Sequence, residues 1–437
     1  MRNARPSLVG SRALRLTLFT GAYFCQGVPI GLLTIALPAW LAAQGVSVGE
    51  IAAYQGIAGL PWGLKLVSGP FMDRFAFPPM GRRRPWVMGA QAGLVLALIS
   101  LMVIQDPLHQ LPLVIALAFV VNAFAAVQDV AVDGMAIDVL PESERGRANA
   151  FMGFGQFAGF WSFAAICGLL LTHFGLAAAA AVCALTVGTV LAFITWVRER
   201  AGERLFPWSR GEAAPRAIPV ASTFADIFKG LFKVLLLPMS VILTIAEWTV
   251  RMRDGVALAV LPVVATQTLG FSAAAYSSMQ GAMGFAIAFV GIAIGPLIDR
   301  YGAKTFYMLG IAGSGIVTLV FALSEPLWSS TPWVFTLWCL GNFFNQMIFV
   351  SFIACAMSIC WPAVAASQFA IYMSLSNLAR SVGSGLFAPV ANRMDVQEQF
   401  LLMLVLMVVA FVTVWFLRLD RHATSLKTLD EATSSAS

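Results

Sequence analysis

Apolar runs, each about as long as a helix that crosses a bilayer, follow one another along all 437 residues and leave mostly short connections. Crossing the hydrocarbon core takes about 20 apolar residues in a helix. Only 11% of the residues are charged, against about a quarter in soluble proteins. We therefore predict an all-α integral membrane protein. Its twelve spans are expected at about 14–41, 49–72, 85–104, 112–138, 147–172, 176–196, 234–264, 272–298, 304–323, 332–360, 367–390 and 397–417.

The positive charges predict how the chain is threaded. Most of the 27 Lys and Arg residues fall in alternate connections and at the chain ends, whereas the opposite set of connections holds only Arg393. Cytoplasmic loops carry such an excess of positive charge, so both termini are expected in the cytoplasm. The formal charge of +6 therefore indicates topology, and no nucleic-acid partner is expected.

A short repeat divides the chain into two halves. Gly-Pro-Phe-Met-Asp-Arg at 69–74 follows the second expected span, and Gly-Pro-Leu-Ile-Asp-Arg at 295–300 follows the eighth. We predict two pseudo-symmetric six-helix halves, because duplicated halves are common among transporters. The expected divisions are 1–196, an Arg-rich cytoplasmic linker at 197–222, 223–421, and a disordered tail at 422–437.

Two carboxylates within the fourth span are the first candidates for chemistry. Asn122, Asp129 and Asp133 lie close to one line down a helix at 100° per residue. Acidic residues inside a bilayer are costly and often serve proton or ion pathways. Asp129 and Asp133 are therefore expected to couple transport to protons. The alternative is a fixed ion pair near the cytoplasmic end of the bundle.

Lys65 is the one basic residue of the second span. It lies eight residues before Asp73, about 12 Å along a helix at 1.5 Å per residue. A buried ammonium needs a partner. That partner is either a carboxylate of the fourth span or an anionic substrate.

The seventh and eleventh spans carry further charges. Glu247, Arg251 and Asp254 share a helical face and can neutralise one another, whereas Arg253 and Arg380 have no carboxylate partner of that kind. Two such Arg residues suggest a cavity for a carboxylate, phosphate or chelated anion. Pairing across helices with Glu247 or Asp254 is the alternative.

Uncharged polar residues complete the candidate cavity. They are Gln26, Asn122, Gln156, Asn345 and Asn377, with Tyr23 beside them. Interhelical hydrogen bonds explain such residues as well as substrate binding does.

An enzyme or a sensor is expected less than a transporter. The three His residues fall in loops or the tail, the six Cys residues lie in apolar runs without a Cys-x-x-Cys pair, and no large soluble domain is present. We expect neither a metal site nor a cofactor.

Several motifs resemble those of the major facilitator superfamily. Its Gly-x-x-x-Asp-Arg loop followed by Gly and basic residues is similar to 69–74 with 81–84, and again to 295–304. The first copy departs by an insertion, Phe75 to Met80. That insertion, with the stretches 26–29, 60–65 and 128–134, resembles a narrower family of AmpG-type muropeptide permeases, acetyl-coenzyme A transporters and related siderophore importers.

The resemblance implies a secondary transporter with a central cavity and alternating access. It does not carry over a substrate. The membrane carboxylates Asp129 and Asp133 and the Arg residues of the second half lead us to expect a proton-coupled symporter that imports an anionic or amphipathic solute, with a muropeptide first and a siderophore or coenzyme A thioester as alternatives. The resemblance also implies gating by the loop residues Asp73, Arg74, Arg82, Asp299 and Arg300. We expect a monomer in a bacterial inner membrane.

Overall fold

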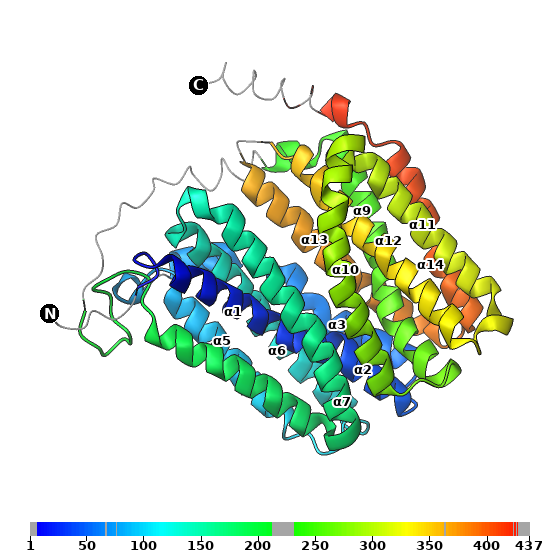
Figure 1. Cartoon of the computed structure of the whole chain (residues 1–437), viewed down its shortest axis with the longest axis horizontal. Coiled ribbons are helices and arrows are strands. Elements are labelled where there is room, and N and C mark those ends of the chain that lie inside the picture. Colours follow the sequence, from blue (N-terminus) through cyan, green and yellow to red (C-terminus); the bar gives the residue numbers. More distant parts are fainter. Residues whose placement is uncertain are drawn as a thin grey trace. The chain divides into compact units, whose positions relative to one another are not determined.

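The computed structural model describes residues 7–65, 68–75, 77–211, 231–361, 364–422, 424 and 426, and the elements of these residues are helices joined by loops (Figure 1). The first helices are α1 (Arg12–Ile30), η1 (Gly31–Ala36), α2 (Leu37–Ala43), α3 (Val48–Leu64), α4 (Ser68–Arg74), η3 (Pro78–Met80), α5 (Arg84–Leu101), α6 (Leu111–Val139) and α7 (Glu142–Trp196). The later ones are α9 (Pro238–Val263), η4 (Val264–Thr268), α10 (Ala273–Tyr301), α11 (Ala303–Leu323), η5 (Glu325–Leu327), α12 (Thr331–Ser358), α13 (Ala365–Ala391) and α14 (Val396–Trp415).

The helices fall where the apolar runs predict them. Within the described residues, eight are long and apolar enough to cross a bilayer. One of these, α7, covers two expected spans, because Gly175 (φ 77°, ψ −177°) breaks it into two arms. The all-helical fold is confirmed, whereas the count of twelve spans and the cytoplasmic side of the termini stay predictions.

The described residues pack as two compact units. The first is drawn from Met1–Ala217 and Leu261–Phe285, and the second from Ile218–Val260 and Ala286–Ser437. Gln267 helps to hold the later stretch in the first unit, because its side-chain amide donates to Ala42 O at 2.8 Å and Val46 O at 3.0 Å. The division at 197–222 stays a prediction, and the tail lies almost wholly outside the described residues.

Pro38 shapes the first membrane-crossing helix. It has no N–H to donate to Thr34 O, and Leu37 N bonds instead to Leu32 O in one wider π-helical turn. The carbonyls of Leu33 and Thr34 are thereby left free. Tyr54 Oη donates to Leu33 O at 2.7 Å, and Gln55 Nε2 donates to Thr34 O at 2.9 Å. The π-helical turn η1 thus forms a hydrogen-bonded junction with α3.

Glycines bring α1 and the first arm of α7 into direct backbone contact. A Cβ at Gly27 would lie 2.3 Å from Gln156 O, and a Cβ at Gly159 would lie 2.2 Å from Phe24 O. Small residues allow such close approach in bilayers, where packing holds helices together. This crossing sets Gln26 beside Gln156.

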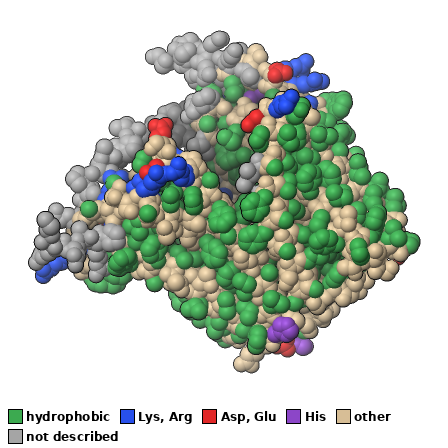
Figure 2. All heavy atoms as spheres, viewed as in Figure 1, with side chains coloured by type: hydrophobic (Ala, Val, Ile, Leu, Met, Phe, Trp, Pro, Cys, Tyr) green, Lys and Arg blue, Asp and Glu red, His purple; other side chains and the backbone are tan. Residues whose placement is uncertain are grey.

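The outer surface along the helices is largely apolar, as a surface in contact with lipid must be. Hydrophobic side chains cover the flanks of the helices, and Lys and Arg side chains gather near the helix ends (Figure 2). Leu96, Val103 and Leu185 are among the large apolar residues that are mostly exposed. Lipid chains are the natural solvent for such a surface.

Candidate functional site

A buried polar cluster in the first unit joins four helices. Lys65 Nζ, at the end of α3, lies 2.8 Å from Asp129 Oδ2 on α6. Gln26 Nε2 on α1 donates to Asp129 Oδ1 at 2.6 Å, and Gln156 on α7 donates to Gln26 Oε1. Of the two alternatives for Lys65, the structure shows the carboxylate of the fourth expected span. Asp129 is therefore satisfied on both oxygens.

Asp133 lies one helical turn further along α6 and is less well compensated. Tyr23 Oη donates to Asp133 Oδ1, and this is its one hydrogen bond within the described part of the chain. Lys65, the nearby cation, donates to Asp129. With both carboxylates ionised, this cluster carries one negative charge in excess.

Asn122 lies on the same face of α6. Its Oδ1 accepts a hydrogen bond of 2.8 Å from Trp62 Nε1, and its Nδ2 donates to Ala118 O at 3.0 Å. This side chain is engaged between α3 and α6. Its contacts are those of a helix-packing residue, the alternative that the sequence left open.

In the second unit, α9 carries an ion-pair ladder along one face. Arg251 Nε donates to Glu247 Oε1 at 2.6 Å, and Arg251 Nη1 donates to Asp254 Oδ2 at 2.8 Å. Tyr307 Oη of α11 donates to Glu247 Oε2 at 2.8 Å, and Ser376 Oγ of α13 donates to Glu247 Oε1 at 2.7 Å. The expected shared face is correct, and three helices meet at Glu247.

Arg253 is a correction to the sequence-based expectation. Its guanidinium donates to Asn345 Oδ1 and Ser314 Oγ, each at 3.0 Å, to Thr318 Oγ1 at 3.4 Å, and to Asp254 Oδ1 at 3.2 Å. The expectation of an unpartnered side chain was wrong because most of these acceptors lie on α11 and α12. Helical spacing within α9 alone cannot reveal them.

Arg380, by contrast, makes no hydrogen bond or ion pair with the described residues, and neither does Asn377 on the same helix. Arg251 also retains an unused donor, because its Nη2 is buried without a hydrogen-bond partner in the described part of the structure. Phe349 lies over the Arg251 guanidinium, with 5.5 Å between Cζ and the ring centroid. The carboxylates of Glu247 and Asp254 balance two of the three charges of Arg251, Arg253 and Arg380. One positive charge is therefore in excess.

The crossing of α9 and α13 brings these charges together. A Cβ at Gly255 would lie 2.0 Å from Arg380 O, and one at Gly383 would lie 2.4 Å from Met252 Cα. Arg251 lies one helical turn before Gly255. This contact places the Arg380 charge close enough to α9 to be repelled by Arg251 and attracted by Asp254 and Glu247.

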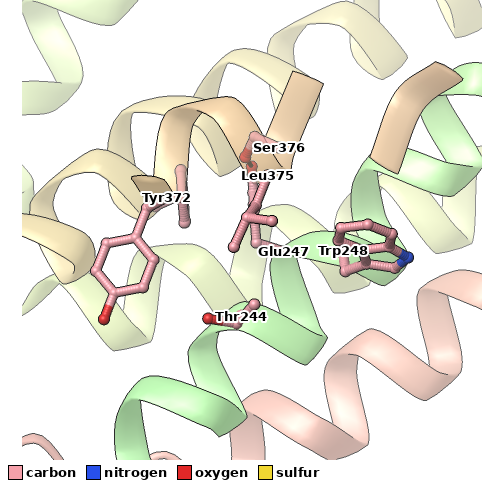
Figure 3. A pocket seen from close by; sticks show the side chains of 7 residues that line it. Thr244, Glu247, Trp248, Tyr372, Leu375 and Ser376 are labelled. Atoms are coloured by element: carbon pink, nitrogen blue, oxygen red, sulfur yellow. Dashed lines mark hydrogen bonds between the residues drawn. The ribbon is translucent and has the colours of Figure 1, made fainter. Parts of the chain in front are cut away.

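A small cavity adjoins Glu247 (Figure 3). Thr244, Glu247, Trp248, Phe352, Tyr372, Leu375 and Ser376 line it. The space open to the centre of a water molecule is about 10 Å³, about enough for one water molecule. The cavity can hydrate the carboxylate, but it is too small for an organic solute.

Glu199, which was not predicted from the sequence, organises the loop that carries the gating candidate Arg82. Its carboxylate accepts from the backbone N–H groups of Arg82 at 3.0 Å, Arg83 at 2.8 Å and Arg84 at 2.6 Å, at the start of α5. An acidic residue at a helix N-terminus satisfies free donors and complements the helix dipole. Gly81 (φ 99°) makes room, since a Cβ there would lie 2.6 Å from the carboxylate. The available signal was the presence of acids, Glu199 among them, in a linker that is otherwise rich in arginine.

Two acids in this linker have raised pKa values. Burial raises the pKa of Glu199 despite its three N–H donors. Burial, reinforced by the charge of Glu199, raises the pKa of Glu203 to about 7. Arg200 N donates to Glu203 Oε2 at 3.0 Å. The linker therefore carries a group that titrates near neutral pH.

The gating candidates differ in their surroundings. Arg82 Nη1 lies 3.7 Å from Asp138 Oδ1, whereas Arg74, Asp299 and Arg300 are exposed. The side chain of Asp73 lies outside the described residues. Their gating role stays a prediction.

Comparison with known proteins identifies the relatives of this chain. The model of the Major Facilitator Superfamily matches residues 19–250 and 243–436. The anhydromuropeptide permease of Escherichia coli strain K12 is 35% identical over 127 residues, which is 29% of this chain and 26% of that protein. A putative transporter AmpG 4 of Rickettsia felis is 30% identical over 137 residues, 30% of this chain and 32% of the relative. The matched part spans about a third or less of these relatives.

Solved structures agree with the fold. A D-xylose-proton symporter superposes with a TM-score of 0.70 at 14% identity, covering 93% of this chain and 98% of that chain. A bacterial homologue of the human lysosomal transporter Spinster, inward-facing and unoccupied, gives 0.70 at 13% identity, covering 95% and 99%. Identity this low shows the shared fold alone.

Proposed function

Because the chain belongs to the Major Facilitator Superfamily, we propose that it is a proton-coupled secondary transporter that imports an anionic or amphipathic solute by alternating access. It is a membrane protein of a transporter family. The proton, the solute and the direction of transport are the proposal. A monomer in a bacterial inner membrane belongs to the same proposal.

The observation that supports proton coupling is the excess negative charge beside Lys65. Asp129 accepts from Lys65 and Gln26, whereas Asp133 has Tyr23 alone among the described residues. An uncompensated carboxylate is costly in a bilayer, so a proton on Asp133 would remove the excess charge. We therefore assign proton binding to Asp133 and the fixed ion pair to Asp129.

The excess positive charge of the second unit supports an anionic solute. Arg380 has no hydrogen-bonded acceptor, and Arg251 Nη2 has none either, within the described residues. Guanidinium groups bind carboxylates and phosphates through paired N–H donors. We assign Arg380 as the first contact of the anion, with Arg251 behind it.

A muropeptide-like solute is the simplest choice, because relatives over part of the chain carry the names anhydromuropeptide permease and AmpG. Such a molecule combines carboxylates with sugar and peptide groups. Siderophores and coenzyme A thioesters are alternatives within the same family resemblance.

Uptake into proteoliposomes tests both the proton coupling and the anionic solute. Vesicles with an imposed inward proton gradient should accumulate a labelled anhydro-muropeptide, and collapse of the gradient should abolish accumulation. Ferric siderophore, acetyl-coenzyme A and a neutral disaccharide serve as competitors. Accumulation that does not depend on the gradient would overturn the proposal of proton coupling. Competition by the neutral sugar alone would overturn the proposal that the solute is anionic.

A further inference from the structure

An exposed aromatic patch lies at the cytoplasmic end of the first unit, on the side predicted from charge. It consists of the exposed Phe71, Phe75, Phe77 and Trp208 and the half-buried Trp86 and Phe206, called here the aromatic patch. Trp208 is 82% exposed, and Phe71 and Phe75 are each 54% exposed. Part of it is the insertion Phe75 to Met80, which gating does not explain.

Ring contacts hold the patch in two groups. The Phe71 ring centroid lies 4.7 Å from that of Phe75 and 5.6 Å from that of Trp86. The Phe206 and Trp208 rings stack with centroids 5.3 Å apart and planes at 4°. Rigid aromatic pairs present apolar area at little conformational cost.

Hydrogen bonds fix the backbone beneath both groups. Ser209 Oγ accepts from Leu205 N at 2.9 Å and Phe206 N at 3.1 Å, which closes the turn that carries Trp208. Arg204 N donates to Pro79 O at 2.7 Å, so the linker is tied to the inserted loop. The two aromatic groups therefore belong to one folded surface.

The patch adjoins the ends of bilayer-crossing helices. Trp86 is in the first turn of α5, and Trp196, which is 53% exposed, ends α7. Tryptophan is enriched at the level of the headgroups, because its ring is apolar and its N–H is polar. Trp86 packs against Phe71, and Arg84 Nη2 donates to Thr195 O at 2.7 Å, so the ends of both helices lie next to the patch.

Two arginines lie near these rings, and two described acids of the linker are buried. Arg74 Cζ lies 6.0 Å from the Phe75 ring centroid, and Arg210 is exposed beside Trp208. Glu199 and Glu203 are buried in the linker. Basic residues next to exposed aromatics favour an anionic bilayer surface.

We propose that the aromatic patch inserts into the headgroup region of the cytoplasmic leaflet and prefers anionic phospholipid, so that it anchors the linker and the inserted loop to the bilayer. This is independent of the solute and of proton coupling. The anchor would hold the linker at a fixed depth while the helices rearrange.

Site-specific fluorescence on the full chain in lipid nanodiscs tests the anchor. A bimane label is placed at Trp208→Cys, and a matched control label at Ala201→Cys, another exposed linker position. Unsubstituted protein carried through the same labelling gives the background of the six native Cys residues. Quenching by brominated phosphatidylcholine reports lipid contact, and quenching by iodide reports contact with water.

The label at 208 should be quenched by brominated lipid and protected from iodide, and the label at 201 should show the reverse. Equal iodide quenching at both positions, without lipid quenching at 208, would overturn the proposal. The patch would then be a candidate surface for a protein partner. Lipid quenching at 208 should fall when phosphatidylglycerol is omitted. It should also fall in Arg210→Gln but not in Arg393→Gln, which changes an exposed Arg elsewhere. Quenching that is unchanged in every case would overturn the anionic preference.

Discussion

Lys65 Nζ lies 2.8 Å from Asp129 Oδ2, and this pairing leaves Asp133, one turn along α6, with the Tyr23 hydroxyl as its described hydrogen-bond partner. Two carboxylates on one helix thus have different surroundings. We expect them to respond differently to the same substitution.

Asp133→Asn should abolish accumulation driven by a proton gradient while preserving exchange of solute across the membrane. The amide cannot take up the proton but still accepts from Tyr23. Counterflow and gradient-driven uptake in the same proteoliposomes separate the two activities. Loss of counterflow in well-folded protein would assign Asp133 to solute binding instead.

Asp129→Asn should reduce stability, because it leaves the Lys65 ammonium buried without its carboxylate. Removing one partner of a buried ion pair costs about 3–5 kcal/mol. Thermal unfolding in detergent measures the loss, and Lys65→Met with Asp129→Asn should restore part of it. A fully stable Asp129→Asn protein would contradict the fixed-pair assignment.

Arg380→Ala should abolish binding of an anionic solute with little change in unfolding temperature, because the side chain makes no described hydrogen bond. Arg253→Ala is the matched comparison. It removes bonds to α11 and α12 and should destabilise by about 1–3 kcal/mol. Ligand-induced thermal shifts of both variants report binding and stability together. A collapse of Arg380→Ala expression would show a structural role.

Gly159→Ala should destabilise the first unit, since its Cβ would lie 2.2 Å from Phe24 O in α1. Overpacking of this kind costs about 1–3 kcal/mol. Gly153→Ala, on the same helix with nothing within 4 Å of its Cβ, should be neutral or stabilising. Equal unfolding temperatures for both variants would contradict the close crossing.

The pH around the linker should control how firmly the linker docks. The pKa of Glu203 is about 7 in the docked linker, above the ordinary 4.5, so the docked form binds the proton more tightly. This stabilisation is fully present below about pH 4.5 and is lost as the pH rises through 7. Hydrogen exchange at 197–211, corrected for the intrinsic effect of pH, should therefore be faster at pH 8 than at pH 6. Glu203→Gln should remove that difference, and persistence of the difference would locate the titration elsewhere.

The sequence predicted what depends on one helix or one charge pattern. The apolar runs predicted the helices, and the spacing of Glu247, Arg251 and Asp254 predicted their ladder. It did not predict the acceptors of Arg253, because these come from helices whose relative rotation is set by packing. Nor did it predict the Glu199 cap, which depends on the chain folding back after α7.

The junction between η1 and α3 has a consequence for how this sequence can vary. Position 34 contributes its carbonyl, and any residue that keeps the π-helical turn supplies one. Gln55 contributes an amide that few other side chains can replace. In a saturation mutagenesis scan, position 34 should therefore accept many small residues, whereas position 55 should accept few. At this junction the side chain that cannot be replaced lies in α3, whereas Pro38 of α2 only leaves the carbonyls that it must satisfy.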